Sequence, residues 1–130
     1  MKRARTTALA LTLTATVGVA GIVGAATAAK ETATTKRMLT AKGTALAFNK
    51  KTLSAPRGPV QLVLNNAAPI EHNVAIRGNG LRAKLGKVVG KGGVSKVTAT
   101  VKPGAYTYFC SVSGHEQAGM KGTLRVPRPR

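Results

Sequence analysis

The sequence predicts an all-β fold, a Greek-key β-sandwich in which about eight strands form two sheets. Short runs rich in Val, Leu, Thr and Tyr alternate with Gly, Pro and Asn, the pattern of strands joined by turns. Residues 96–101, Lys-Val-Thr-Ala-Thr-Val, alternate polar and apolar side chains, as a strand with one buried face does. No stretch after residue 28 has helical periodicity over a useful length. Many short strands at close spacing therefore favour a sandwich.

The first 28 residues have the composition of a secretory signal peptide. Three positive charges at Lys2, Arg3 and Arg5 precede an apolar Ala/Thr/Val-rich run over residues 7–26. Ala26-Thr27-Ala28 then supplies the small residues that a signal peptidase requires, so we expect cleavage after Ala28. An uncleaved membrane anchor is the alternative interpretation, if the threonines of this run are tolerated in a bilayer.

The rest of the chain divides into a lead-in and one domain. Residues 29–38 are polar and lack periodicity, so we expect a flexible lead-in before a single domain over residues 39–130. The sequence Val-Pro-Arg-Pro-Arg at the end cannot continue a central strand, and the glycine-rich residues 78–93 are the most loop-like. The predicted strands are Leu39–Phe48, Thr52–Ser54, Val60–Asn65, Asn73–Arg77, Lys87–Val89, Ser95–Val101, Ala105–Cys110 and Gly122–Val126.

The charge of the chain is strongly basic. Residues 29–130 contain 18 of the 21 Lys and Arg residues and all three acidic residues, a net charge near +15. Such a charge favours acidic partners or anionic surfaces and speeds encounter with them. We do not expect a nucleic-acid partner, because the basic residues are dispersed, aromatic residues are few and no nucleic-acid-binding motif is present.

A single cysteine, Cys110, limits what the thiol can do. One cysteine cannot form a disulfide within the chain, so a disulfide framework is excluded. In an exported protein this thiol is buried and inert, paired with another chain, or bound to a metal.

The surroundings of Cys110 favour the metal. The segment CSVSGHEQAGM places Cys110, His115 and Met120 in one loop between two predicted strands, and His72 begins another predicted strand. One thiolate, two imidazoles and one thioether are the donor set of copper electron-transfer sites, with a His₂Cys plane and a weak axial Met. Zinc is a weaker interpretation because it seldom takes a thioether. A Cys–His nucleophile is weaker still, since no oxyanion hole or orienting third residue is recognisable.

The two segments YTYFCSVSGHEQAGMKGTLRV and EHNVAI resemble the blue-copper cupredoxins, the plastocyanin and auracyanin type in particular. The resemblance implies a cupredoxin-like fold and one type 1 copper ion held by His72, Cys110, His115 and Met120. It also implies that Asn73 and Ser111 brace the ligand loop and the thiolate by hydrogen bonds. His115 matches the histidine that serves as the electron port, with Gly114, Ala118 and Pro69 on its rim.

Three positions depart from the family pattern. Ser113 replaces the proline that often precedes the Gly-His pair, which predicts a less rigid loop. Glu71 stands where azurin-like members have a glycine whose carbonyl approaches copper, so a fifth ligand is not predicted. Phe109 replaces a tyrosine, and the basic charge differs from the acidic surface of plant plastocyanins.

These observations predict that the protein is not an enzyme. We expect an exported, periplasmic or extracellular blue-copper monomer that shuttles single electrons between a redox donor and a redox acceptor with acidic docking surfaces. Association with an anionic membrane or cell-envelope surface is a further expectation from the charge. A copper carrier or scavenger of the cell envelope is the main alternative, and a structural or docking domain is the second.

Overall fold

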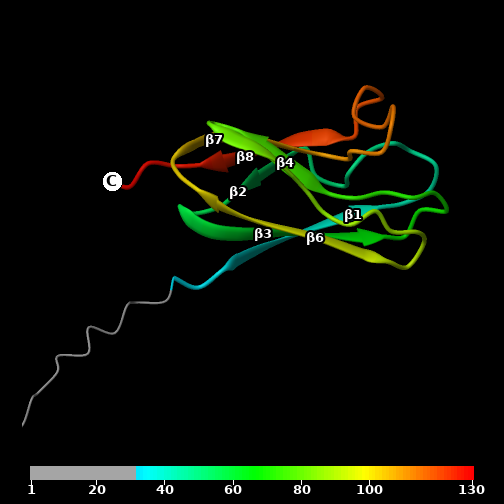
Figure 1. The fold of residues 1–130 in the computed structure, drawn as a ribbon, viewed down its shortest axis with the longest axis horizontal. Helices are drawn as coiled ribbons and strands as arrows, with labels where there is room; N and C mark the ends of the chain where they lie inside the picture. The colour runs from blue at the N-terminus through cyan, green and yellow to red at the C-terminus, as the bar shows by residue number, and fades with distance from the viewer. Residues whose placement is uncertain (1–31) are drawn as a thin grey trace, which may run out of the picture.

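The computed structural model describes residues 32–130, which form eight β-strands and no helix (Figure 1). The prediction of an all-β sandwich with about eight strands in two sheets is confirmed. None of the described residues forms a helix that is long and apolar enough to cross a membrane. The predicted signal peptide lies outside these residues. The strands are β1 (Thr35–Ala41), β2 (Thr52–Ser54), β3 (Gly58–Asn66), β4 (Ala75–Gly78), β5 (Leu81–Leu85), β6 (Val94–Val101), β7 (Gly104–Phe109) and β8 (Lys121–Val126).

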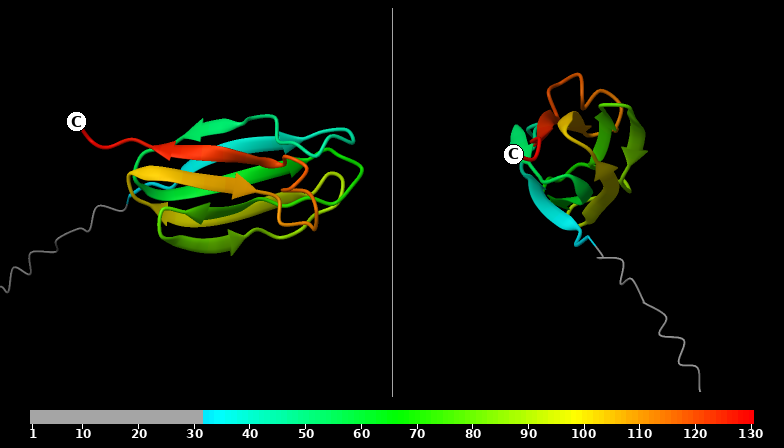
Figure 2. Two further views of the ribbon diagram at one scale, coloured as in Figure 1. Left: turned by 90° about the horizontal axis from the view of Figure 1, so that it is seen from above. Right: turned by 90° about the vertical axis from the view of Figure 1, so that its left-hand side faces the viewer.

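The strands form one three-stranded and one five-stranded sheet, packed face to face (Figure 2). The smaller sheet has the order β1-β3-β6, and the larger has the order β2-β8-β7-β4-β5. The edge strands β1 and β2 pair in parallel with β3 and β8, whereas the other pairs are antiparallel. Each sheet thus combines strands that are distant in sequence, and the loops between them gather at the two ends of the sandwich.

Alternating side chains fill the space between the sheets. In β6 every second residue is buried, and the predicted inward face of Val97, Ala99 and Val101 is confirmed. Burying one such valine side chain stabilises the fold by about 1.5–3 kcal/mol. The fully buried large side chains of the core include Leu39, Leu62, Leu64, Ile76, Tyr108, Met120 and Leu124.

The first strand corrects two predictions. The predicted lead-in of residues 29–38 is wrong from Thr35 onward, because β1 starts there and pairs with β3 from Thr35↔Val60 to Ala41↔Asn66. The hydrogen bonds of this parallel pair compensate for the weak local pattern. The predicted extension of the strand to Phe48 is also wrong, since residues after Ala41 turn away and Gly43 adopts a left-handed φ of 63°.

The structure of the glycine-rich residues 78–93 corrects two further predictions. This segment contains β5, which pairs with β4 in a hairpin whose two-residue loop is Asn79-Gly80. Both loop residues have positive φ, 49° and 82°, as the tight turn of a hairpin requires. The predicted strand Lys87–Val89 is wrong, because only Val89 pairs there, in an isolated bridge with His72. The missed hairpin lies next to that bridge and so helps to position the segment around His72.

The loop Ser111–Gly119, orange in Figures 1 and 2, lies at the opposite end of the sandwich from the C-terminus. It connects β7 to β8, the two central neighbours of the larger sheet. The loop that precedes β4 and the loop that precedes β6 reach the same end. This convergence brings His72 and the cysteine loop together.

Candidate metal centre

The ligand loop is closed at its base by backbone hydrogen bonds. The amide of Cys110 donates to the carbonyl of Met120 at 3.0 Å, and the amide of Met120 donates to the carbonyl of His115 at the same distance. Gly114 and Gly119 have φ values of 81° and 107°, a region that favours glycine, so the chain can reverse direction within this short loop. The backbone of three predicted ligands is therefore linked directly.

The second histidine is held by a separate segment. His72 and Val89 exchange two backbone hydrogen bonds of 3.1 and 2.9 Å. The buried side chain of Asn66 donates to the carbonyls of Ile70 and Val89, both at 2.9 Å, and accepts from the amide of Ala68 at 3.0 Å. Asn66 thus shapes the turn before His72 and fixes the segment around Val89, which lies opposite it.

Three donor atoms converge at the end of the sandwich. The Nδ1 atoms of His72 and His115 are 3.1 Å apart, and the Sγ atom of Cys110 lies 3.9 Å from the first and 3.5 Å from the second. A point equidistant from these three atoms lies about 2.0 Å from each, and for comparison zinc–imidazole bonds are about 2.0–2.1 Å long. The triangle therefore has the size of a metal site. These residues form a candidate metal cluster, with His72 and Cys110 buried and His115 partly buried.

The protonation of His72 suits a ligand. Burial lowers the pKa of His72, and the neighbouring His115 lowers it further. The imidazole therefore remains neutral over a wider pH range, with a lone pair available for a metal. Its other ring nitrogen, Nε2, is buried and has no hydrogen-bond partner within residues 32–130. The orientation of the ring consequently depends on the backbone bridge and on packing.

Asn73 and Ser111 lie together beside the thiol. The side-chain oxygen of Asn73 accepts from the amide of Ser111 at 2.7 Å, and its nitrogen donates to the Ser111 hydroxyl at 2.7 Å and to the Gly86 carbonyl at 2.9 Å. The backbone amide of Asn73 also donates to the sulfur of Cys110 at 3.5 Å. These bonds join the two ligand-bearing segments, and an amide directed at sulfur stabilises the thiolate form.

Met120 is fully buried and belongs to the hydrophobic core. It follows the loop directly, and its backbone bonds to Cys110 and His115 place it at the base of the cluster. A thioether in this position can serve either packing or weak coordination.

An ion pair ties the ligand loop to the sheet. The guanidinium of Arg77 on β4 forms a two-pronged contact with the carboxylate of Glu116 and lies over the ring of Phe109, 4.2 Å from its centroid. Glu116 follows His115, and Phe109 precedes Cys110. The Arg77 side chain therefore contacts the direct neighbours of two predicted ligands. The pKa of Glu116 is lowered, first by its hydrogen bond to Arg77.

The sequence interpretation missed Asn66, Arg77 and Glu116. Asn66 lies in the turn-forming sequence Asn-Asn-Ala-Ala-Pro, where an Asn that bonds nearby backbone groups is a recognised signal. No local signal identifies the Arg77–Glu116 pair, because its members are 39 residues apart and meet only in the folded chain.

Gly114, Ala118 and Pro69 are exposed, and His115 is partly buried. The imidazole of His115 is thus the donor nearest to solvent, whereas Cys110 and His72 are shielded completely. In this arrangement one ligand of the centre reaches toward the protein surface, while the other ligands are shielded from water.

Comparison with known structures supports the fold. A reduced auracyanin from the photosynthetic bacterium Roseiflexus castenholzii is 24% identical, with a TM-score of 0.62 over 75% of this chain and all of that one. Auracyanin B is 28% identical, with a TM-score of 0.64 over 74% of this chain and 90% of that one. Auracyanin A, a blue copper protein of Chloroflexus aurantiacus, is 24% identical, with a TM-score of 0.61 over 72% of this chain and 99% of that one. No curated protein sequence matches the chain significantly.

Residues 35–127 match the family described as copper binding proteins, plastocyanin/azurin family. The match covers all eight strands and both ligand-bearing segments. The donor chemistry agrees with it, because a thiolate and two imidazoles with a nearby thioether suit copper better than zinc. One type 1 copper ion is the cofactor that this donor set fits. The chain therefore belongs to the plastocyanin/azurin family of copper-binding proteins, the blue-copper cupredoxins.

Proposed function

We propose that this protein is an exported blue-copper protein that passes single electrons between redox partners. The observation that carries the proposal is the triangle of Cys110 Sγ and the Nδ1 atoms of His72 and His115, whose sides of 3.1–3.9 Å match one shared metal ion. In the proposed site these three residues would hold the copper ion, and Met120 would add a weak thioether ligand. Copper supplies a one-electron couple between Cu(I) and Cu(II).

The surrounding residues would keep this site nearly unchanged between the two redox states. The thiolate and thioether favour Cu(I), while neutral imidazoles accept Cu(II), so the set is a compromise between both. Asn73, Ser111 and Asn66 hold the two ligand-bearing segments by hydrogen bonds of 2.7–3.0 Å. Small movement of ligands favours fast electron transfer. His115, with Gly114, Ala118 and Pro69 around it, is the proposed exit and entry point for the electron.

We further propose that the N-terminal 28 residues direct export and that the mature protein acts as a monomer at the periplasmic or extracellular face. Its partners would carry acidic docking surfaces, because the chain has a large positive charge. The fully buried donors Cys110 and His72 argue against the rival function of a copper carrier, which needs an accessible, exchangeable ion. We propose no enzymatic reaction.

Redox cycling in the presence of a chelator separates the two functions. Copper-loaded protein is reduced with ascorbate and reoxidised with hexacyanoferrate(III) for several cycles, with excess bathocuproine disulfonate present as a Cu(I) chelator. An electron carrier keeps its copper and its full absorbance through the cycles. Transfer of copper to the chelator during the first reductions would favour the carrier and contradict the proposal.

A further inference from the structure

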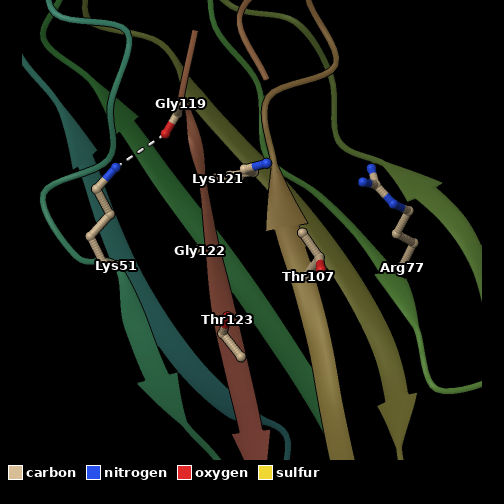
Figure 3. Close-up of a pocket in the computed structure, with 7 residues that line it drawn as sticks. All are labelled: Lys51, Arg77, Thr107, Gly119, Lys121, Gly122 and Thr123. Atoms are coloured by element: carbon tan, nitrogen blue, oxygen red, sulfur yellow. Dashed lines mark hydrogen bonds between the residues drawn. The ribbon is translucent and has the colours of Figure 1, made fainter. Parts of the chain in front are cut away.

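A groove lies on the outer face of the five-stranded sheet, beside the ligand loop (Figure 3). Its volume is about 450 Å³. Three cationic side chains border it from different segments: Lys51 before β2, Lys121 at the start of β8, and Arg77 on β4. The hydroxyl-bearing Thr107 and Thr123, which are cross-strand partners, lie between them. We call the groove lined by these five residues, Gly119 and Gly122 the basic groove.

Two of the three cationic side chains in the basic groove form no ion pair. Among the described residues the Arg77–Glu116 contact is the only ion pair, so no carboxylate lies within salt-bridge distance of Lys51 or Lys121, although the charge of Lys121 also acts on Glu116 from farther away. The Nζ atom of Lys51 donates one hydrogen bond, to the carbonyl of Gly119 at 3.1 Å, which fixes its position at the edge of the groove. An ammonium group has three donors, so this lysine retains two for an incoming group.

The position of the groove connects it to the metal centre. Gly119 and Lys121 are the chain neighbours of Met120, and Lys121 pairs across the sheet with Phe109, the residue before Cys110. A molecule in the groove would therefore rest against backbone that is bonded directly to two proposed ligands. Binding there would bring a redox partner beside the metal centre.

We infer that the basic groove is the docking site for the carboxylate side chains of an acidic redox partner protein. The inference rests on the proposed function and adds to it a location and a ligand chemistry. Two ammonium groups from separate segments, with the hydroxyls of Thr107 and Thr123 nearby, suit a cluster of Asp and Glu side chains on a protein surface. Complementary charge of this kind steers the encounter and fixes the orientation of the complex.

The test uses charge reversal at two positions and a matched control. The variant K51E/K121E reverses the groove, whereas K36E/K96E makes the same change in net charge on β1 and β6 of the other sheet, where both lysines are exposed. Circular dichroism verifies that both variants fold. The Cu(I)-loaded proteins, labelled with ¹⁵N, are titrated with a hexaglutamate peptide as the probe.

We expect amide shifts to concentrate at residues 51, 107 and 119–123 in the parent protein. K51E/K121E should bind the peptide roughly tenfold more weakly, while K36E/K96E should lose much less. Equal losses in the two variants, or shifts spread over both sheets, would overturn the inference. So would shifts of the groove residues caused by phosphatidylglycerol vesicles and not by the peptide.

The same samples keep this inference separate from the proposed function. Each protein is cycled with ascorbate and hexacyanoferrate(III) in the absence of the peptide. Reversible cycling with no groove-specific binding refutes the docking site alone. Groove-specific binding without reversible cycling refutes electron shuttling, and with it the redox nature of the partner.

Discussion

Replacing Asn73 with alanine should destabilise the protein strongly, because one buried side chain joins both ligand-bearing segments. Asn73 is 1% exposed, and its amide makes three hydrogen bonds, two to Ser111 and one to the Gly86 carbonyl. The N73A variant loses all three and leaves a buried carbonyl and the Ser111 amide without partners. At a net 0.5–1.5 kcal/mol for each of the three bonds, the free energy of unfolding should fall by about 1.5–4.5 kcal/mol.

The assay is urea unfolding of the metal-free protein, so that metal affinity does not enter the stability. Two control variants test whether the lost hydrogen bonds of Asn73 cause the destabilisation. S111A removes one of the three hydrogen-bond partners and should lower the free energy of unfolding by about 1 kcal/mol. N65A truncates an exposed asparagine of β3 and should stay within about 0.5 kcal/mol of the parent. A loss for N73A no greater than that for S111A would refute the assigned network.

Three further predictions concern the axial residue, the core and the loop ion pair. M120L should keep the blue colour but raise the reduction potential measured by voltammetry, because losing a weak donor destabilises Cu(II) more than Cu(I). An unchanged or lower potential would show that Met120 is not the axial ligand. G122A should lower the free energy of unfolding by roughly 1–3 kcal/mol, because its Cβ would lie 2.2 Å from the Tyr108 hydroxyl. The control G90A, whose Cβ would meet nothing within 4 Å, should be nearly neutral in thermal melts. The pKa of Glu116 is lowered from 4.5. Its ion pair therefore contributes to the free energy of unfolding at neutral pH, and this contribution is lost as the pH falls below that value. The difference in the free energy of unfolding between the parent and E116Q should therefore be well under about 1 kcal/mol for this partly exposed pair, and should shrink in acid unfolding titrations as the pH falls below 4.5. A difference that grows in acid would contradict the assigned ion pair.

The fold class and the strands with a strong local pattern were predictable from the sequence. In β6 the alternation of Val97, Ala99 and Val101 with polar residues fixed both the strand and its buried face. The start of β1 was not predictable in this way, since Thr35–Met38 become a strand through pairing with β3. The hairpin of β4 and β5 was missed because glycine content outweighed the Asn79-Gly80 signal, which is specific for tight hairpins.

The residues of the candidate site likewise fall into those that were predictable from the sequence and those that were not. The donor residues were recognisable because Cys110, His115 and Met120 share one loop and their types are rare in the chain. Their supporting contacts were not, since Arg77 meets Glu116 and Asn66 reaches Val89 only after the strands have assembled. The ligand residues can be recognised from their spacing along the chain, whereas the residues that position them are brought together only by tertiary packing.

The most direct test of the proposed site is the visible absorption spectrum after one equivalent of Cu(II) is added to residues 29–130 and to the C110S variant. The parent should develop an intense blue band from the thiolate–copper interaction, which ascorbate bleaches and reoxidation restores. C110S should remain folded but lack that band. A colourless parent, or a C110S variant that keeps the blue band, would contradict a copper site in which Cys110 is a ligand.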